Sequence, residues 1–341
     1  MSIVFEITTD SPDFNQLTRR RTLNIPMREN TLDYSIIVPT YNSGKFIREC
    51  MQHIFASDYP RDKYEIILVD GGSCDNTLDI ARECGDVTIM HSTNQSISNS
   101  RNIGAMNARG ENFLFLDSDC LMDRRFLSRA REHLNKYQCY GAFYRPPDNS
   151  GWVTKAWLVS EGKEEGIVDW ITAGTLAVSS EVFREIGGFN EQLATGEDME
   201  LCQRIRKSGY TIYNDPTVGS MHLGQADSIF DFFKKEVWRG KSMLKSLRMN
   251  LSQNIYPIYP FAIIIYSFTL FAFIVSLLIN NIFMMGISFL LLVGMPTVLA
   301  LKKSVKTGQY SLMIQFLVLW FVYLLARSYS LIKFRQYRDL L

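Results

Sequence analysis

The sequence predicts an α/β domain with a parallel sheet, followed by helices that cross a membrane. From residue 34 onward, short apolar runs alternate with stretches whose apolar residues repeat at helical spacing, a pattern typical of βαβ units with right-handed crossovers. Residues 249–301 contain no charged side chain, and this length is enough for two membrane helices of ~20 residues each. The chain of 341 residues is long enough to hold both parts.

Four apolar runs in the first part are predicted strands, and helices are predicted between and after them. The strands are residues 34–38, 65–69, 87–90 and 113–116, and the helices are residues 46–55, a segment after Asp75, residues 98–109 and residues 124–137. Because ligands of open parallel sheets bind beyond the carboxyl ends of the strands, Asp70 and Asp117 are expected at the ligand-binding edge.

Two carboxylates, Asp117 and Asp119, directly follow the fourth predicted strand. A pair of acids separated by a small serine can share a hard divalent cation, or can divide between a cation and a sugar hydroxyl. The same residues could instead form a solvated turn in which Asp119 caps the following helix. This motif alone leaves both interpretations open.

The charge of the chain is divided between its two parts. From Ser228 onward there are 13 lysines and arginines and 3 acids, a net charge of +10, and the preceding residues carry a net charge of −9. Because the basic part flanks the most apolar part, we expect contact with anionic membrane lipids and no binding of nucleic acid. The six cysteines form no CxxC pair, so we expect free thiols in a reducing compartment.

Six motifs, matched in order and spacing, carry a resemblance to a known family. They are IIVPTYN (36–42), VDGGSCDNT (69–77), SRNIGAMNARGENFLFLDSD (100–119), TAGTLAVS (172–179), GGFNE (187–191) and GEDMELCQRIRKSG (196–209). The series resembles the inverting glycosyltransferases of family two, whose fold is GT-A, a Rossmann-like nucleotide-diphospho-sugar transferase fold. The resemblance covers roughly residues 33–224.

The resemblance implies a site for a nucleotide-diphosphate sugar, either UDP-linked or GDP-linked. It implies a donor pocket made by Pro39, Tyr41, Asn42, Asp70, Gly72 and Arg101, with Asp117 near the ribose or the sugar. It also implies that Asp119 holds a metal ion at the diphosphate. Mg²⁺ or Mn²⁺ is expected, because a divalent cation stabilises the negative charge that develops on the leaving diphosphate.

An inverting displacement also needs a base on the opposite face of the sugar. Glu197 and Asp198 open an amphipathic helical pattern, and the resemblance assigns the base to Asp198. The two acids could instead merely complement a helix N-terminus, a contribution of ~0.3–1 kcal/mol. His222 falls where many relatives complete the metal site with a histidine, but it could equally be a lone histidine at a strand end.

Trp238 and Arg239 occupy a predicted amphipathic helix at residues 228–247. In relatives an aromatic and basic motif here often closes over the diphosphate and the acceptor, so both residues are expected at the donor site. The alternative is a helix that lies on the membrane interface. The full QxxRW pattern of processive synthases is absent from the sequence, which argues against a polymerising synthase.

We therefore divide the chain into an N-terminal extension (1–32), a GT-A domain (33–227), an amphipathic interfacial helix and linker (228–254) and a transmembrane region of two or three helices (255–334). The catalytic domain and a loop bearing Lys302, Lys303 and Lys306 are expected on the cytoplasmic side. A third uncharged run, residues 307–326, ends at Arg327. If it crosses, the basic C-terminus lies outside, so this segment could instead be re-entrant or lie along the interface.

The sequence thus predicts a multi-pass, metal-dependent, hexosyltransferase-type enzyme acting on a polyprenyl-linked sugar or a growing polysaccharide. One alternative is transfer to a polyprenyl phosphate itself. Another is a non-catalytic membrane scaffold, against which the intact acids Asp70, Asp117, Asp119 and Asp198 argue. Nucleotidyl transfer would ordinarily need a glycine- and lysine-rich phosphate loop, which PTYNSG (39–44) does not supply. The sequence specifies neither the sugar and acceptor nor the oligomeric state.

Overall fold

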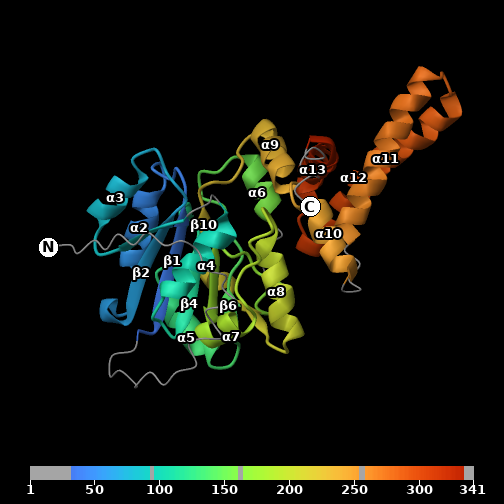
Figure 1. Cartoon of the computed structure of the whole chain (residues 1–341). Helices are drawn as coiled ribbons and strands as arrows, with labels where there is room; N and C mark the ends of the chain where they lie inside the picture. Colours follow the sequence, from blue (N-terminus) through green and yellow to red (C-terminus); the bar gives the residue numbers. More distant parts are fainter. Residues whose placement is uncertain (1–31, 93–95, 160–163, 253–257, 334–341) are drawn as a thin grey trace. The chain divides into compact units, whose positions relative to one another are not determined.

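The structure, a computed structural model, describes residues 32–92, 96–159, 164–252 and 258–333 and divides into two compact units (Figure 1). Of the described residues, the sheet unit contains 32–147 and 164–224, and the helical unit contains 148–159 and 225–333. Residues 148–159 therefore belong to the helical unit, although the predicted GT-A domain (33–227) includes them. The predicted N-terminal extension up to residue 31 and the basic C-terminus from residue 334 lie outside the described residues.

An eight-stranded sheet with the order β3-β2-β1-β4-β8-β6-β9-β7 forms the centre of the sheet unit. The strands are β1 (Tyr34–Thr40), β2 (Tyr64–Asp70), β3 (Thr88–His91), β4 (Asn112–Leu116), β6 (Cys139–Gly141), β7 (Gly166–Ile167), β8 (Thr175–Ser179) and β9 (Ile212–Asn214). The four predicted strands pair in parallel. β8 pairs antiparallel with β4 and β6, so the expected wholly parallel sheet is wrong beyond β4. Apolar periodicity marks a strand but carries no information about its direction.

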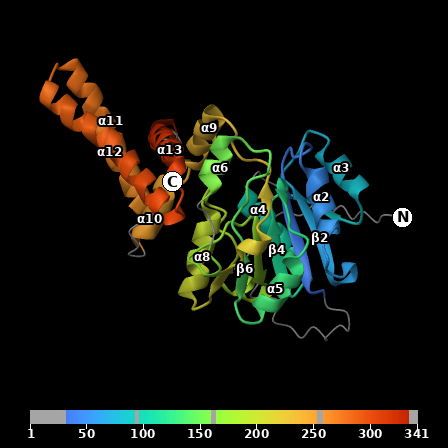
Figure 2. The ribbon, with the colours of Figure 1, turned by 180° about the vertical axis from the view of Figure 1, so that it is seen from behind.

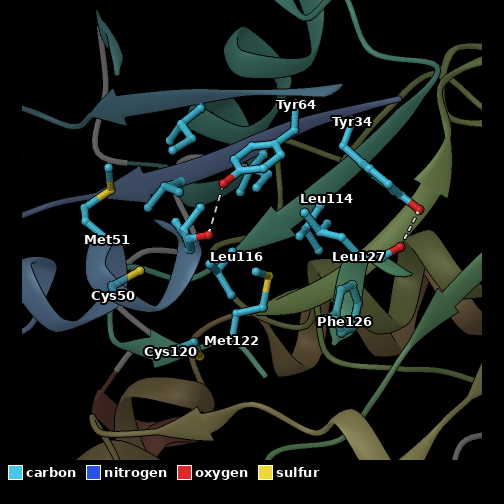
Figure 3. Close-up of a cluster of buried hydrophobic side chains, with 14 of the residues drawn as sticks. Tyr34, Cys50, Met51, Tyr64, Leu114, Leu116, Cys120, Met122, Phe126 and Leu127 are labelled. Atoms are coloured by element: carbon cyan, nitrogen blue, oxygen red, sulfur yellow. Dashed lines mark hydrogen bonds between the residues drawn. The ribbon is translucent and has the colours of Figure 1, made fainter. Parts of the chain in front are cut away.

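Both faces of the sheet are buried, which explains the continuous apolar runs of its strands. Alternate residues face opposite sides: Ile36 and Val38 belong to one core cluster and Ile37 to the other. Figure 3 shows the first cluster, where the buried hydroxyls of Tyr34 and Tyr64 donate to the carbonyls of Leu127 and Ile54 at 3.0 and 3.3 Å. The sheet unit therefore has three layers, with helices over both faces (Figure 2).

The helices divide between the two core clusters. The first cluster includes residues of α2 (Ile47–Phe55), α3 (Thr77–Cys84) and α5 (Phe126–Leu134), and the second includes residues of α4 (Ile97–Asn107), α7 (Ser180–Glu185) and α8 (Glu197–Lys207). The helix predicted at 124–137 is thus shorter at both ends. Its start is set by Asp123, whose carboxylate accepts from the Arg125 N–H at 3.0 Å, so Asp119 does not cap it.

The strand registers bring the predicted ligand edge together. Thr40 lies opposite Asp70, and Asp70 opposite His91, at the carboxyl ends of β1, β2 and β3. Asp117 follows the last residue of β4, whose parallel pairing with β1 ends at the same edge. Asp70 and Asp117 therefore both lie at the carboxyl edge, as the sequence predicts.

The helical unit begins with α6 (Trp152–Leu158) and continues from α9 (Ile229–Arg239) through α10 (Met243–Ser252). The single helix predicted at 228–247 is wrong, because α9 ends before Gly240. A Cβ atom at Gly240 would lie 2.1 Å from the Ser330 Oγ, so α9 and α13 approach each other closely here. This packing, rather than helix periodicity, sets the break.

Three helices of the helical unit are long and apolar enough to cross a membrane: α11 (Ile258–Leu278), α12 (Ile282–Thr307) and α13 (Met313–Lys333). The predicted division at Asn280 and Asn281 is confirmed, since the Asn281 carboxamide caps α12 by accepting from the Met284 N–H at 3.0 Å. The expected lysine loop is wrong, because Lys302, Lys303 and Lys306 lie in the last turns of α12. Basic residues thus lie in the C-terminal parts of α12 and α13, whereas α11 contains none.

Arg327 ends the third uncharged run but not the third helix, which continues to Lys333. It lies inside α13, and its guanidinium pairs with the carboxylate of Glu236 on α9 at 2.9 Å. Glu236, which is 1 % exposed, also pairs with Arg239. The cation is thus neutralised within the protein, which lets the helix continue past it.

Candidate active site

A tight turn follows β4 and holds the two carboxylates of the DSD motif. The Cys120 N–H donates to the Asp117 carbonyl at 2.9 Å, which closes the turn over Ser118 and Asp119. The Ser118 hydroxyl lies 2.8 Å from the Ser43 hydroxyl, so the turn is tied to the loop after β1. The side chains of Asp117 and Asp119 are 20 % and 26 % exposed, so both remain accessible at the edge of the sheet.

His222 reaches this turn through a two-stranded ribbon. β5 (Cys120–Leu121) pairs antiparallel with β10 (Met221–His222), and His222 lies directly opposite Cys120. The Leu223 N–H extends the ladder by donating to the Asp119 carbonyl at 2.8 Å. The His222 Nε2 then lies 3.8 Å from the Asp119 Oδ1. Residues a hundred positions apart in the sequence are thus brought into one cluster.

This cluster can hold a divalent cation. One ligand atom each of Asp117, Asp119, Cys120 and His222 lies within 4.8 Å of the others. Carboxylate oxygens suit Mg²⁺ and Mn²⁺, and an imidazole nitrogen is an ordinary additional ligand for transition metals. Gly224 keeps space beside the cluster, because a Cβ there would lie 1.9 Å from the Asp119 Oδ2. The donor set therefore fits the metal that the sequence predicts.

Arg101 connects the DSD turn to the helix that bears Asp198. Its guanidinium, on α4, donates to the Asp117 Oδ1 at 2.7 Å and to the Glu197 Oε1 at 2.8 Å, and the side chain is 2 % exposed. The guanidinium also packs over the Phe189 ring, 5.1 Å from its centroid. Arg101 therefore connects α4 with the end of β4 and the start of α8, and its side chain does not project freely into a pocket.

Asp198 is a candidate proton acceptor. The pKa of its carboxyl is raised from 3.8 to about 7, mainly by burial and then by repulsion from Glu197, while hydrogen bonding by the Met199 N–H and the charge of Arg101 oppose the shift. Glu197 is engaged by Arg101, which leaves Asp198 as the acid of α8 that can exchange a proton near neutral pH.

Tyr144 is a residue of the site that the sequence motifs do not mark. Its hydroxyl donates to the Asp117 Oδ2 at 3.2 Å, and its ring packs edge-on against the His222 ring at 4.5 Å. Burial raises the pKa of Tyr144 well above its ordinary value, so the hydroxyl remains a donor. Gly174 makes room for it, since a Cβ there would lie 1.9 Å from the Tyr144 Oη. Tyr144 follows β6 and Gly174 precedes β8, so no local pattern could have joined them.

The loops after β1 and β2 form the other side of the edge. The Asn42 N–H donates to the Ser73 hydroxyl at 2.8 Å, and the Asn42 Oδ1 accepts from the Cys74 N–H at 2.9 Å. Asn42 has a positive φ of 48°, which an asparagine tolerates better than most residues. Tyr41 is 47 % exposed beside it, whereas Pro39 is buried within β1.

Asp70 is oriented toward its own loop. Its Oδ2 accepts from the N–H groups of Gly72 and Ser73 at 3.1 and 3.0 Å, and its Oδ1 accepts from the Ser73 hydroxyl at 2.5 Å. Gly72 has a φ of 90°, and a Cβ there would meet nothing within 4 Å. The loop thus offers open backbone at Gly72, and contact of Asp70 with a nucleotide stays a prediction.

Trp238 and Arg239 belong to α9 of the helical unit. Trp238 is 51 % exposed, and the Arg239 Nη1 donates to the Glu236 Oε1 at 2.6 Å. Asp117 and Asp119 belong to the sheet unit, and the expected role of Trp238 and Arg239 at the donor stays a prediction.

Comparison with known proteins identifies the chain. Residues 35–190 match the model of Glycosyl transferase family 2, and residues 167–223 match a model described as the N-terminal domain of galactosyltransferase. A dolichyl N-acetyl-α-D-glucosaminyl phosphate 3-β-D-2,3-diacetamido-2,3-dideoxy-β-D-glucuronosyltransferase of Methanococcus voltae is 26% identical over 73% of this chain and 86% of its own length. Glycosyltransferase AglE of Haloferax volcanii is 27% identical over 62% of this chain and 73% of its own length.

A solved structure shares the fold. The mannosyltransferase PcManGT from Pyrobaculum calidifontis, in complex with GDP-Man and Mn²⁺, superposes with a TM-score of 0.61 at 19% identity and covers 95% of this chain and 94% of its own. Its likeness, together with the mixed sheet, defines the GT-A fold of the sheet unit. Residues 35–190 therefore form a domain of glycosyl transferase family 2, and the chain is a glycosyltransferase.

Proposed function

We propose that this enzyme moves a sugar, with inversion, from a nucleotide-diphosphate donor onto a lipid-linked glycan acceptor at a membrane, with a divalent cation. One observation carries the proposal. Arg101 joins Asp117 of the DSD turn to Glu197, the neighbour of Asp198, so the candidate metal cluster and the candidate base are fixed to each other by a buried ion pair. An inverting transferase needs these two groups on opposite sides of one sugar.

The donor set favours Mn²⁺ or Mg²⁺ held by Asp119 and His222, with Asp117 beside them. When bound, such a cation stabilises the charge of the departing nucleotide diphosphate. The Pyrobaculum protein of the same fold is in complex with GDP-Man and Mn²⁺, which agrees with this assignment. Arg101 and Tyr144 each donate a hydrogen bond to one oxygen of Asp117, which fixes the orientation of this carboxylate. In this orientation it can accept a hydrogen bond from a ribose or sugar hydroxyl.

The acceptor hydroxyl gives its proton to Asp198 in this proposal. The raised pKa of about 7 lets the carboxyl take a proton and release it again near neutral pH. Pro39, Tyr41, Asn42, Asp70 and Gly72 line the nucleotide side, where the exposed Tyr41 ring offers a surface on which a base can stack.

The acceptor is proposed to be lipid-linked because of the helical unit. The Methanococcus relative is named for a dolichyl-linked phosphate sugar, and three helices of this chain are long enough to cross a membrane. If α11 and α12 both cross, the basic residues before α11 and those ending α12 lie on one side, which the positive-inside rule places in the cytoplasm. The chain passes from the sheet unit into α9 and α10 before it reaches α11. The sheet unit is then cytoplasmic too.

The test uses the full chain in lipid nanodiscs that carry a polyprenyl-linked sugar. Nucleotide sugars are screened for Mn²⁺-dependent binding by calorimetry and for transfer by product analysis, including the configuration at the new bond. Asp119→Asn should lose the metal-dependent part of donor binding, about tenfold or more, while its melting temperature is kept. Asp123→Asn is the matched control, because this nearby acid is engaged by Arg125 outside the cluster.

Four results would overturn parts of the proposal. Unchanged metal-dependent binding by Asp119→Asn would remove the metal assignment, and a retained anomeric configuration would remove inversion. Transfer to polyprenyl phosphate but not to the linked sugar would replace the acceptor. Failure of every nucleotide sugar to bind would favour a scaffold without catalysis.

A further inference from the structure

Cys120 places a sulfur atom in the candidate metal cluster, which neither the DSD motif nor the proposed function uses. Its Sγ is one of the four ligand atoms that lie within 4.8 Å of one another. Two independent features put it there. The turn brings Cys120 back to Asp117 through the 2.9 Å hydrogen bond, and the β5–β10 ribbon sets Cys120 directly opposite His222, so that both side chains lie on the same face of the ribbon.

The solvent exposure of the side chains increases from one end of the cluster to the other. Cys120 is 0 % exposed and the His222 side chain 12 %, whereas the carboxylates of Asp117 and Asp119 are 20 % and 26 % exposed. The thiol and the imidazole therefore form the inner side, and the carboxylates form the side that faces solvent and would meet a diphosphate. A cation that is drawn toward the inner side would exchange oxygen ligands for sulfur and nitrogen.

The donor chemistry separates two classes of cation. Carboxylates and water select Mg²⁺ and Mn²⁺, whereas thiolate and imidazole select Zn²⁺ and its heavier congener Cd²⁺. When a thiophilic cation binds, the sulfur–metal bond forms as the S–H bond breaks, and the proton leaves to water or buffer. No oxidant or reductant is required for this step.

We propose that Cys120, with His222 and Asp119, makes this site a second kind of metal site, which binds Zn²⁺ or Cd²⁺ through sulfur in competition with the hard cation. The proposal rests on the proposed function only in sharing Asp119 and His222 with the catalytic metal. It predicts that a thiophilic cation displaces Mn²⁺ and holds the enzyme in an inactive form, because the cation sits toward the inner side of the cluster.

Cys50 provides a matched control within the same core. It is also 0 % exposed and belongs with Cys120 and Met122 to the first core cluster (Figure 3). Its Sγ lies 3.8 Å from the Asp117 carbonyl oxygen, yet it is not one of the four clustered ligand atoms. If Cys120 only fills space like a small apolar side chain, the two cysteines should respond alike to substitution and to Cd²⁺.

The experiment titrates Cd²⁺ into the full-length, reduced, metal-stripped protein in nanodiscs. The exposed Cys74 is replaced by serine throughout so that it cannot bind Cd²⁺ itself. The ultraviolet sulfur-to-cadmium charge-transfer band should appear at stoichiometric Cd²⁺, vanish in Cys120→Ser and persist in Cys50→Ser. The Cd²⁺ affinity should fall about tenfold or more in Cys120→Ser and in His222→Gln. In parallel, electron paramagnetic resonance should show Mn²⁺ released by Zn²⁺ from the parent but much less readily from Cys120→Ser.

The outcomes distinguish this inference from the proposed function. An unchanged band in Cys120→Ser, or Zn²⁺ displacing Mn²⁺ equally well from both proteins, would show that the thiol only packs. If Cys120→Ser does not fold, X-ray absorption at the cadmium edge of the parent protein decides, since a first shell of oxygen and nitrogen alone would refute a sulfur ligand. If the protein shows Mn²⁺-dependent transfer but no Cys120-dependent band, the proposed function stands and this inference is refuted. If the band is present but no transfer occurs, this inference stands and the proposed function is refuted.

Discussion

Replacing Asp198 with asparagine should separate the chemical step from substrate binding. The substitution keeps the shape of the side chain but removes its ability to take a proton from the acceptor hydroxyl. Loss of a general base costs ~10² or more in kcat. Donor affinity should change little, because the candidate metal cluster lies in the turn after β4 and in the β5–β10 ribbon, whereas Asp198 lies on α8. The pH profile should change as well: kcat/KM of the parent should rise with pH up to about 7, where Asp198 becomes ionised, and that limb should disappear in the variant.

The same substitution has a calculable effect on stability. The pKa of Asp198 is 3.8 ordinarily and about 7 in the folded protein, so between these values the folded state keeps a proton that the unfolded state has lost. Stability is therefore present below pH 3.8 and decreases as pH rises toward 7. At 1.36 kcal/mol for each pH unit, the loss is at most about 4 kcal/mol, and repulsion shared with Glu197 makes this an upper bound. The asparagine variant should lack this loss.

Two measurements test the reasoning. Melting temperatures of parent and variant should agree at pH 4 and diverge by pH 8, with the variant the more stable, and single-turnover transfer should show the kinetic loss. Glu200→Gln is the control, since Glu200 lies in the same first turn but pairs with Arg204 at 2.7 Å. Parent-like kcat in Asp198→Asn, or equal melting temperatures at every pH, would refute the assignment of the base.

Two further substitutions probe the framework of the site. Arg101→Met should leave the carboxylates of Asp117 and Glu197 without their buried partner and destabilise the protein by about 3–5 kcal/mol, measured as a lower melting temperature; an unchanged value would mean that the ion pair is not formed. Gly174→Ala should reduce kcat and also lower the melting temperature, because the new methyl group would lie 1.9 Å from the Tyr144 Oη and 2.6 Å from the Asp117 Oδ2 and force both side chains to move. Parent-like turnover in Gly174→Ala would show that the position of Asp117 is not critical.

The order of the first four strands and the place of the ligand edge follow from the sequence. Apolar runs bounded by turn residues mark β1, β2, β3 and β4, because a strand buried on both faces must be apolar throughout. Asp70 and Asp117 follow two of these runs, so their place at the edge depends only on parallel pairing. The three apolar helices are equally local, since their length and lack of charge can be counted along the chain.

Other parts of the site depend on pairings between distant segments. β5 and β10 contain two residues each, too few for any periodicity, and exist only because they pair with each other. In the sequence, Arg101 is only a basic residue of a predicted helix. The approach of α4 to α8 is what buries its guanidinium and pairs it with Glu197.

The same contrast holds in the helical unit. The uncharged run at residues 307–326 ends at Arg327, and the partner of Arg327, Glu236, lies 91 positions earlier in the chain. Residues 148–159 have no membrane-like composition, yet α6 packs with α13, where the ammonium of Lys303 donates to the Trp157 carbonyl at 2.7 Å. The sequence by itself thus determines the first four strands, the apolar helices and the residues that follow those strands, because these depend on neighbours along the chain. Only the tertiary structure decides strand direction, the joining of His222 and Cys120 to the DSD turn and the pairing of buried charges, because each of these requires two distant segments to meet.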